Sequence, residues 1–376
     1  MLFQKTRMTR HTTLICIGTI LMLVLMPLSA RGEQNETAHA EELQTLIRKV
    51  EENEAFYDDL KLNLTSTKSD VNPLFAIDVP KPIVCETQIM LDVQELKFRQ
   101  EDQSKGRFIV ITQGGLGWLN QKKDPANANY TNIGTKTWIT VCDAKTSRYF
   151  WTDDVVAEKR GQQRKKSSKG GISDKPMPLP NLARPHMFLL ENVGLKIPLS
   201  TYLKGAKAIR SYPGPSQLRK GTKLKVQILG SEACQGLLCT KISIEYIDPK
   251  GTPRSRREFW LAQDRNLTPV RNLSYTYRDS KEMPIAEAII DEWQEVSPGV
   301  WFPRQAHYNR FGSMTVKREG RQELSWHVTY DVNRVQLEPQ FSPEVFTTLK
   351  FPPGTKVTLV KDGKIIKTID VEANEL

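Results

Sequence analysis

The side chains of this sequence that could do chemistry are few and widely spaced. His307 and His327 fall in strand patterns and could approach each other on neighbouring strands, whereas Asp291 and Glu292 point to opposite faces of one strand. The sequence has no HExxH or GxSxG motif, and no cysteine has a plausible histidine partner. We therefore predict no catalytic residue and no enzyme of the classes that carry such motifs; a hydrolase with a dispersed site remains an alternative.

Four cysteines follow residue 30, and an even number in an exported chain predicts two disulfides. The short turn between Cys234 and Cys239 favours that pair, which leaves Cys85 with Cys142. Free buried thiols are the alternative. The Cys-x4-Cys pair has no histidine or second cysteine pair at ligand spacing, so we predict no metal and no cofactor.

The N-terminus predicts export. Three basic residues within positions 1–10 precede an apolar run over 12–28, and small residues end the segment at Ala30. This order is typical of a secretory signal peptide cleaved after Ala30. The alternative is an uncleaved anchor helix, although the run is slightly short for a span of about 20 residues. The predicted location is the periplasm or cell envelope.

A basic segment interrupts the middle of the chain. The sequence carries 54 Lys and Arg against 43 Asp and Glu, and much of this excess lies between Lys159 and Lys175. Low hydrophobicity with high charge predicts a disordered insert over 158–184. The insert could bind an anionic lipid surface or an acidic polymer, or it could be a solvated loop. No aromatic residues interleave with the charges, so we predict no specific nucleic-acid partner.

The rest of the sequence follows strand periodicity around a central meander within 257–311. Turn residues such as Ser297-Pro298-Gly299 separate its members, and short connections make neighbouring strands antiparallel. The predicted meander strands cover 259–261, 270–277, 285–296 and 300–308. Longer strands are predicted over 84–98 and 323–337, with a final hairpin over 357–371.

Alternation along these strands produces one apolar face that must be covered. In the second meander strand Leu273, Tyr275 and Tyr277 share a face, which predicts a half-buried sheet. One long helix is predicted over 41–60, where apolar residues recur at helical spacing. This helix is a natural cover for the apolar face of the sheet.

Several segments of the sequence resemble those of a known family. They are KVEENEAFYDDL in the predicted helix, FWLAQDRNLTPVR and EWQEVSPGVWFPRQAHY in the meander, and FPPGT at the close. In these the chain resembles the LolA/LolB-like superfamily of bacterial periplasmic outer-membrane lipoprotein-sorting proteins. The resemblance implies an α+β, mostly β fold: a large curved antiparallel sheet, or incomplete barrel, with an N-terminal helix covering its concave face.

The resemblance covers 41–157 and 185–355, the two parts of this half-barrel. Around them lie a signal peptide over 1–30, a polar leader over 31–40, the insert over 158–184 and a C-terminal hairpin over 356–376. This chain is much longer than the lipoprotein carriers. None of their ligand-contacting residues aligns with it, so none is carried over.

In the carriers of this superfamily the apolar cavity holds acyl chains. The resemblance therefore implies an exported, non-enzymatic binding protein for a lipid or a lipidated protein. The alternative is an envelope scaffold that binds an anionic surface or polymer through its basic insert. Candidate lining residues come from the apolar strand faces, each with plain core packing as its alternative: Phe259, Leu261, Leu273, Tyr275, Trp293, Trp301, Trp326 and Tyr330.

Overall fold

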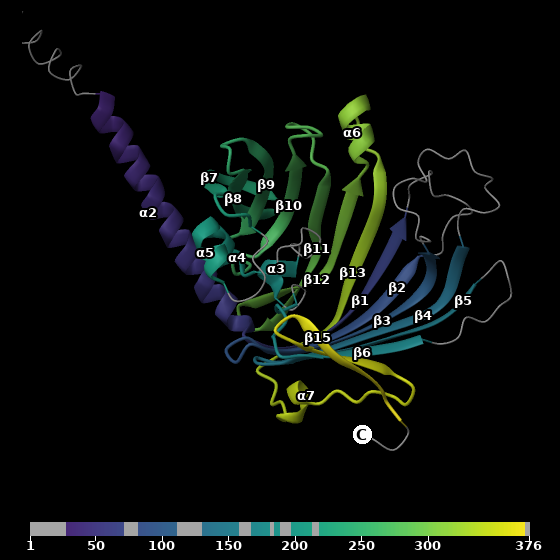
Figure 1. Cartoon of the computed structure of the whole chain (residues 1–376). Helices are drawn as coiled ribbons and strands as arrows, with labels where there is room; N and C mark the ends of the chain where they lie inside the picture. The colour runs from purple at the N-terminus through teal and green to yellow at the C-terminus, as the bar shows by residue number, and fades with distance from the viewer. Residues whose placement is uncertain are drawn as a thin grey trace, which may run out of the picture. The chain divides into compact units, whose positions relative to one another are not determined.

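A computed structural model (Figure 1) describes residues 28–70, 82–110, 130–157, 167–180, 184–188, 197–212 and 218–372. The chain divides into two compact units, Met1–Leu46 and Ile47–Leu376. Most of the predicted signal peptide therefore lies outside the described residues. Among the helices that the structure describes, none is long and apolar enough to cross a bilayer.

The predicted N-terminal helix is confirmed as α2 (Leu28–Glu54), which also includes the predicted polar leader. It ends earlier than expected, because Ala55–Tyr57 tighten into the 3-10 turn η1 and the first strand begins at Asp59. The apolar period changes at this point from the helical spacing to alternation, starting with Leu60, Leu62 and Leu64.

Fifteen strands form one sheet in the described part of the chain. Their bounds are β1 (Asp59–Asp70), β2 (Ile83–Asp92), β3 (Lys97–Val110), β4 (Tyr130–Asp143), β5 (Ser147–Ala157), β6 (Ser167–Ser173), β7 (Lys223–Cys234), β8 (Leu237–Ile247), β9 (Pro253–Ala262), β10 (Pro269–Thr276), β11 (Ala286–Ser297), β12 (Val300–Phe311), β13 (Leu324–Leu337), β14 (Lys356–Lys361) and β15 (Lys364–Asp370).

The strand order is β15-β14-β6-β5-β4-β3-β2-β1-β13-β12-β11-β10-β9-β8-β7. Strands β9 to β12 are the predicted meander, and β14 with β15 is the predicted final hairpin. The expected fold class is confirmed: a mostly β chain with one large sheet that does not close into a barrel, and an N-terminal helix. The sheet is mixed rather than wholly antiparallel, because β14 pairs in parallel with β6.

Short helices lie on one face of this sheet, which we call the inner face and which bears Leu62, Phe259 and Tyr330. Phe188 of α3 (Pro185–Phe188) packs edge-on against Tyr330 at 5.3 Å between ring centroids. Tyr202 of α4 (Leu199–Leu203) packs against Phe259 in the same way at 6.3 Å. Figure 1 shows α3, α4 and α5 (Ala206–Ser211) grouped beside the strands of the meander.

The outer face is covered in two different ways. Over β4 and β5, Val141 and Phe150 pack with apolar residues from the segment that leads through α7 (Glu344–Thr347) into β14. Over β9 and β10 the cover is cationic, since the guanidinium of Arg256 lies 4.2 Å from the Tyr275 ring and Lys241 lies 4.5 Å from the Trp260 ring. The apolar face predicted from Leu273 and Tyr275 is therefore an outer face, covered by cations rather than by a helix. Helix α6 (Ser313–Glu319) connects β12 to β13.

Two segments differ from the sequence predictions. The strand predicted over 84–98 is two strands, β2 and β3, joined by a turn in which the carboxylate of Asp92 accepts the backbone N–H of Glu95 at 2.8 Å. Residues 167–173, expected to lie in a disordered insert, form β6 between β5 and β14. Backbone pairing with a strand on each side offsets the loss of chain entropy on folding. Burial of the few apolar residues in this segment could not offset that loss alone.

None of the four described cysteines is in a disulfide, so neither predicted pair is formed. Cys85 lies opposite Ser104 of β3 and Cys142 opposite Phe98, which separates the two by six positions of that strand. That is about 20 Å along the strand, against the roughly 7 Å that a disulfide spans. Cys234 and Cys239 lie diagonally on β7 and β8, and the hydrogen bond from Cys239 lowers the pKa of the Cys234 thiol to about 7.

A buried polar contact fixes the turn between β9 and β10 against α3. Asn266, at a φ of 55°, accepts the Nε2–H of His186 on its backbone oxygen at 2.6 Å. Its side-chain oxygen accepts the backbone N–H of Trp301 at 2.9 Å. Complete burial lowers the pKa of His186, so this ring is neutral at neutral pH.

Glu54 joins the end of α2 to α4 through buried hydrogen bonds. One carboxylate oxygen accepts the backbone N–H of Leu199 at 2.7 Å, and the other accepts the hydroxyl of Ser200 at 2.5 Å. Both donors belong to the first turn of α4, which has no side-chain cap of its own. Glu54 therefore caps a helix that lies far away in the sequence.

Replacing Glu54 by Ala should lower the free energy of unfolding by about 1–3 kcal/mol, because a buried N–H and a buried hydroxyl lose their acceptor. Urea-induced unfolding measures this loss. The matched control is Glu52→Ala, since the Glu52 side chain is 60% exposed and pairs with Arg48 one turn away. Such a pair contributes at most about 0.5 kcal/mol. Equal losses in the two variants would contradict the capping role.

Candidate ligand-binding cavity

The register of β1 to β5 arranges the inner face into cross-strand rows whose polarity changes along the strands. The first two rows are mainly apolar: Leu60, Leu91, Phe98, Cys142 and Ser147, then Leu62, Ile89, Gln100, Thr140 and Tyr149. The next two are increasingly polar: Leu64, Thr87, Asp102, Trp138 and Trp151, then Ser66, Cys85, Ser104, Lys136 and Asp153. The strand register therefore places an apolar end and a polar end on one face.

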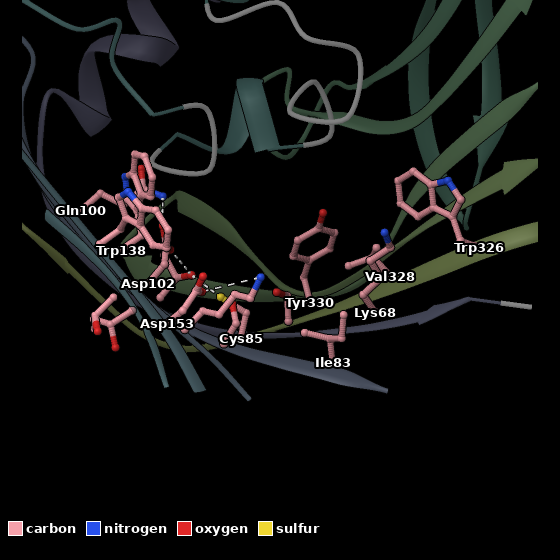
Figure 2. Close-up of a pocket in the computed structure, with 17 residues that line it drawn as sticks. Lys68, Ile83, Cys85, Gln100, Asp102, Trp138, Asp153, Trp326, Val328 and Tyr330 are labelled. Atoms are coloured by element: carbon pink, nitrogen blue, oxygen red, sulfur yellow. Dashed lines mark hydrogen bonds and ion pairs between the residues drawn. The ribbon is translucent and has the colours of Figure 1, made fainter. Parts of the chain in front are cut away.

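A cavity of about 850 Å³ lies over the polar end of these rows. Figure 2 shows Trp138, Asp102 and Gln100 on one side of it, and Trp326 and Val328 on the other. Its volume falls within the range of about 300–1,000 Å³ that small-molecule sites occupy. The described residues that line it are Ser66, Lys68, Ile83, Cys85, Thr87, Gln100, Asp102, Ser104, Lys136, Thr137, Trp138, Trp151, Thr152, Asp153, Trp326, Val328 and Tyr330.

Asp102 is the most constrained charged group of the cavity. Thr87 donates its hydroxyl to Oδ1 at 2.6 Å, and Gln100 donates its amide to Oδ2 at 2.7 Å. Burial raises the pKa of Asp102, and these two hydrogen bonds oppose that shift only in part. The carboxyl is thus held in place by two neutral donors, and no cation of the described residues is bonded to it.

The other charges of the cavity lie against partners on its wall. The ammonium of Lys136 is 3.7 Å from the carboxylate of Asp153, and that of Lys68 lies 4.9 Å from the centroid of the Trp326 ring. Two lysines and two aspartates are among the described residues of the lining, so the formal charges of this part of the cavity balance.

Trp138 presents a fixed aromatic plane at the cavity wall. Its ring stacks on Tyr149 with 5.7 Å between centroids and an interplanar angle of 5°. Its indole N–H donates to the hydroxyl of Thr140 at 2.7 Å. Although held on two sides in this way, Trp138 is 43% exposed, which is unusual for so large an apolar side chain.

Two of the residues predicted as ligand-lining, Trp326 and Tyr330, lie in this cavity. Phe259 and Leu261 are fully buried in the sheet, while Leu273 and Tyr275 pack in the cluster of the outer face. The remaining two lie elsewhere, Trp293 packed between two core clusters and Trp301 beneath the guanidinium of Arg265 at 3.9 Å.

Sequence reasoning missed the wall formed by β3, β4 and β5. Its signal was the two-residue spacing of Gln100, Asp102 and Ser104, which matches that of Lys136 and Trp138 on the neighbouring strand. The predicted approach of the two histidines is confirmed, with 5.7 Å between ring centroids and a hydrogen bond of 2.8 Å between His307 Nδ1 and Asp291. They lie outside the cavity lining, and no three His, Cys, Asp or Glu of the described residues are grouped to hold a metal.

No protein-family model and no curated protein matches this chain. Among solved structures it is similar to a DUF1329 family protein from Desulfovibrio piger, with 13% identity and a TM-score of 0.34, over 82% of this chain and 97% of that one. It is also similar to a putative outer membrane lipoprotein-sorting protein domain from Vibrio parahaemolyticus, with 7% identity and a TM-score of 0.35, over 80% and 95%. Similarity this low carries no argument about a ligand.

Asp102 should make stability depend on pH. Because its pKa is raised in the folded state, the stability it contributes is full below the unfolded pKa of about 3.9 and is lost as pH rises through the folded pKa. Asp102→Asn cannot ionise and avoids this loss, so the variant should gain stability relative to the parent as the pH rises from about 4 through the folded pKa of Asp102. Denaturant unfolding of both proteins at several pH values measures this, and a difference that does not change with pH would contradict it.

Proposed function

We propose that this chain is an exported, non-enzymatic binding protein of the cell envelope that holds a lipid or a lipidated protein in the cavity on its inner face. The observation that carries the proposal is the amphipathic lining of the 850 Å³ cavity. The wall from β13 is apolar and aromatic, with Trp326, Val328 and Tyr330. The facing wall of β3, β4 and β5 carries the polar groups Asp102, Lys136 and Asp153, beside two tryptophans. An amphiphile has the same division between its chain and its head.

The energy available for holding an acyl chain is sufficient for useful affinity. Each buried methylene contributes about 0.8 kcal/mol, so even part of a chain placed against Ile83 and Val328 would stabilise a complex. The apolar rows that begin at Leu60 and Leu62 continue below the cavity as close-packed core. The chain would therefore lie across the cavity floor rather than run deep into the sheet.

Export and the absence of catalysis in this proposal rest on the sequence. The basic start and apolar run of the first 28 residues support passage across a membrane. The resemblance to lipoprotein carriers supports a role in binding rather than in reaction.

A second candidate function is docking on an anionic surface, and one feature of the C-terminal hairpin favours it. Ile365 and Ile366 of β15 are 71% and 64% exposed, and the exposed Lys361, Lys364 and Lys367 surround them. This hairpin pairs directly with β6, which lies within the predicted basic insert. Apolar side chains flanked by lysines are suited to the surface of an anionic bilayer.

Ser66→Trp should abolish ligand binding, because residue 66 points into the cavity and a tryptophan there fills it. Thr67→Trp is the matched control, since the next residue of β1 points to the opposite face. Native mass spectrometry of each purified protein, followed by organic extraction, measures bound lipid. A parent protein that carries no lipid and takes up none from phospholipid or lipopeptide would contradict the proposal, as would uptake by Ser66→Trp equal to that of the control.

The second candidate is tested by charge reversal, because deleting the basic segment 158–175 would remove the whole of β6. Replacing Lys364 and Lys367 by Glu should weaken co-sedimentation with phosphatidylglycerol vesicles more than about tenfold, since each lysine contributes about 1 kcal/mol at an anionic surface. The same reversal at Lys223 and Lys225, exposed on the edge strand β7, is the control. Equal binding by both variants would exclude docking through the hairpin.

A further inference from the structure

The polar wall of the cavity has features that discriminate between classes of headgroup. We propose that it recognises a neutral, hydroxyl-rich head, so that the ligand of this protein is a glycosylated amphiphile. This inference rests on the proposed function and specifies its ligand. It is argued from the charge balance, the hydrogen-bonding groups and the aromatic planes of β3, β4 and β5.

Charge balance argues against a strongly charged head. A phosphate placed near Lys136 would also lie near Asp153, which is 3.7 Å from that ammonium. A cationic head attracted to Asp102 would meet Lys136 in the neighbouring row. Either ion would gain attraction from one group and repulsion from the next, whereas a neutral head avoids both.

The wall also lacks a vacant aromatic cage for a quaternary ammonium. Lys68 already lies over the Trp326 ring, and Lys169 lies 5.4 Å from the centroid of the Trp151 ring. A choline group would have to displace these lysines from the ring faces that it needs. Of the cavity tryptophans, Trp138 is the one stacked on another aromatic ring, and neutral C–H groups suit such a plane.

Hydrogen-bonding groups of both senses surround that plane. Each oxygen of Asp102 already accepts one bond, from Thr87 or from Gln100, and a carboxylate oxygen can accept a second. Lys136, opposite Ser104 in the next row, supplies donors. A sugar ring presents hydroxyls that both donate and accept along its edge and C–H groups on its face, which matches this combination of carboxylate, ammonium and indole.

Isothermal titration with decyl maltoside, decyl phosphocholine and free maltose, below micelle-forming concentrations, tests the inference. Decyl maltoside should bind at least about tenfold more tightly than decyl phosphocholine, because a site built to hydrogen-bond hydroxyls discriminates against a head that lacks them. Free maltose should bind more weakly than decyl maltoside, since it lacks the chain.

Two variants test whether residues of the polar wall cause this discrimination between headgroups. Asp102→Ala and Trp138→Ala should each lower the affinity for decyl maltoside by about tenfold and leave that for decyl phosphocholine nearly unchanged. Trp301→Ala is the control, because that tryptophan lies outside the cavity lining. Loss of affinity for both detergents in either wall variant would contradict headgroup recognition by that residue.

The outcomes for the parent protein separate the two proposals. Equal or tighter binding of decyl phosphocholine overturns the headgroup inference and leaves the binding of amphiphiles intact. No binding of either detergent overturns both proposals. Maltose binding as tight as that of decyl maltoside would support recognition of the sugar and overturn the lipid-binding function.

Discussion

The pairing of β1 with β13 is the contact on which the cavity depends. It sets Leu60 opposite Leu337 and Asp70 opposite Trp326, and so joins the first six strands and the C-terminal hairpin to the meander. The two walls of the cavity come from opposite sides of this seam, with Trp326 and Tyr330 on β13 and Asp102 on β3. A shift of one residue along the seam would turn one wall to the outer face, because side chains alternate between faces.

The two ends of the inner face differ because they have different covers. At the apolar end, close packing of η1, α3 and the strands buries the rings of Tyr57, Phe188 and Phe302, and excludes a ligand. At the other end the rows become polar and aromatic, and the cavity lies over them. The same strands therefore supply both core and site, and the change occurs within about two residues along each strand, roughly 7 Å.

Local structure was predictable from the sequence, and the site was not. The hairpins of the meander follow from alternation and from turns such as Ser297-Pro298-Gly299, which act over a few residues. The turn between β2 and β3 has no glycine or proline, although Leu96 adopts a φ of 53° within it. The sequence pattern therefore predicted one continuous strand in place of two. Without that turn, Gln100 and Asp102 could not be assigned to the face of Trp138. In a sequence, a polar residue facing a cavity looks the same as one facing solvent.

The parallel pairing of β6 with β14 has a consequence for how the chain assembles. Lys169 of β6 lies opposite Lys356 of β14, so this contact closes a very long loop of chain. Such non-local pairing forms late, since the loop entropy must be overcome before any contact gains stability. Until the last strands arrive, β6 is an uncapped edge with unpaired amides next to the apolar residues of β5. A chaperone that binds this edge during folding would compete with the C-terminal hairpin for the backbone groups of β6.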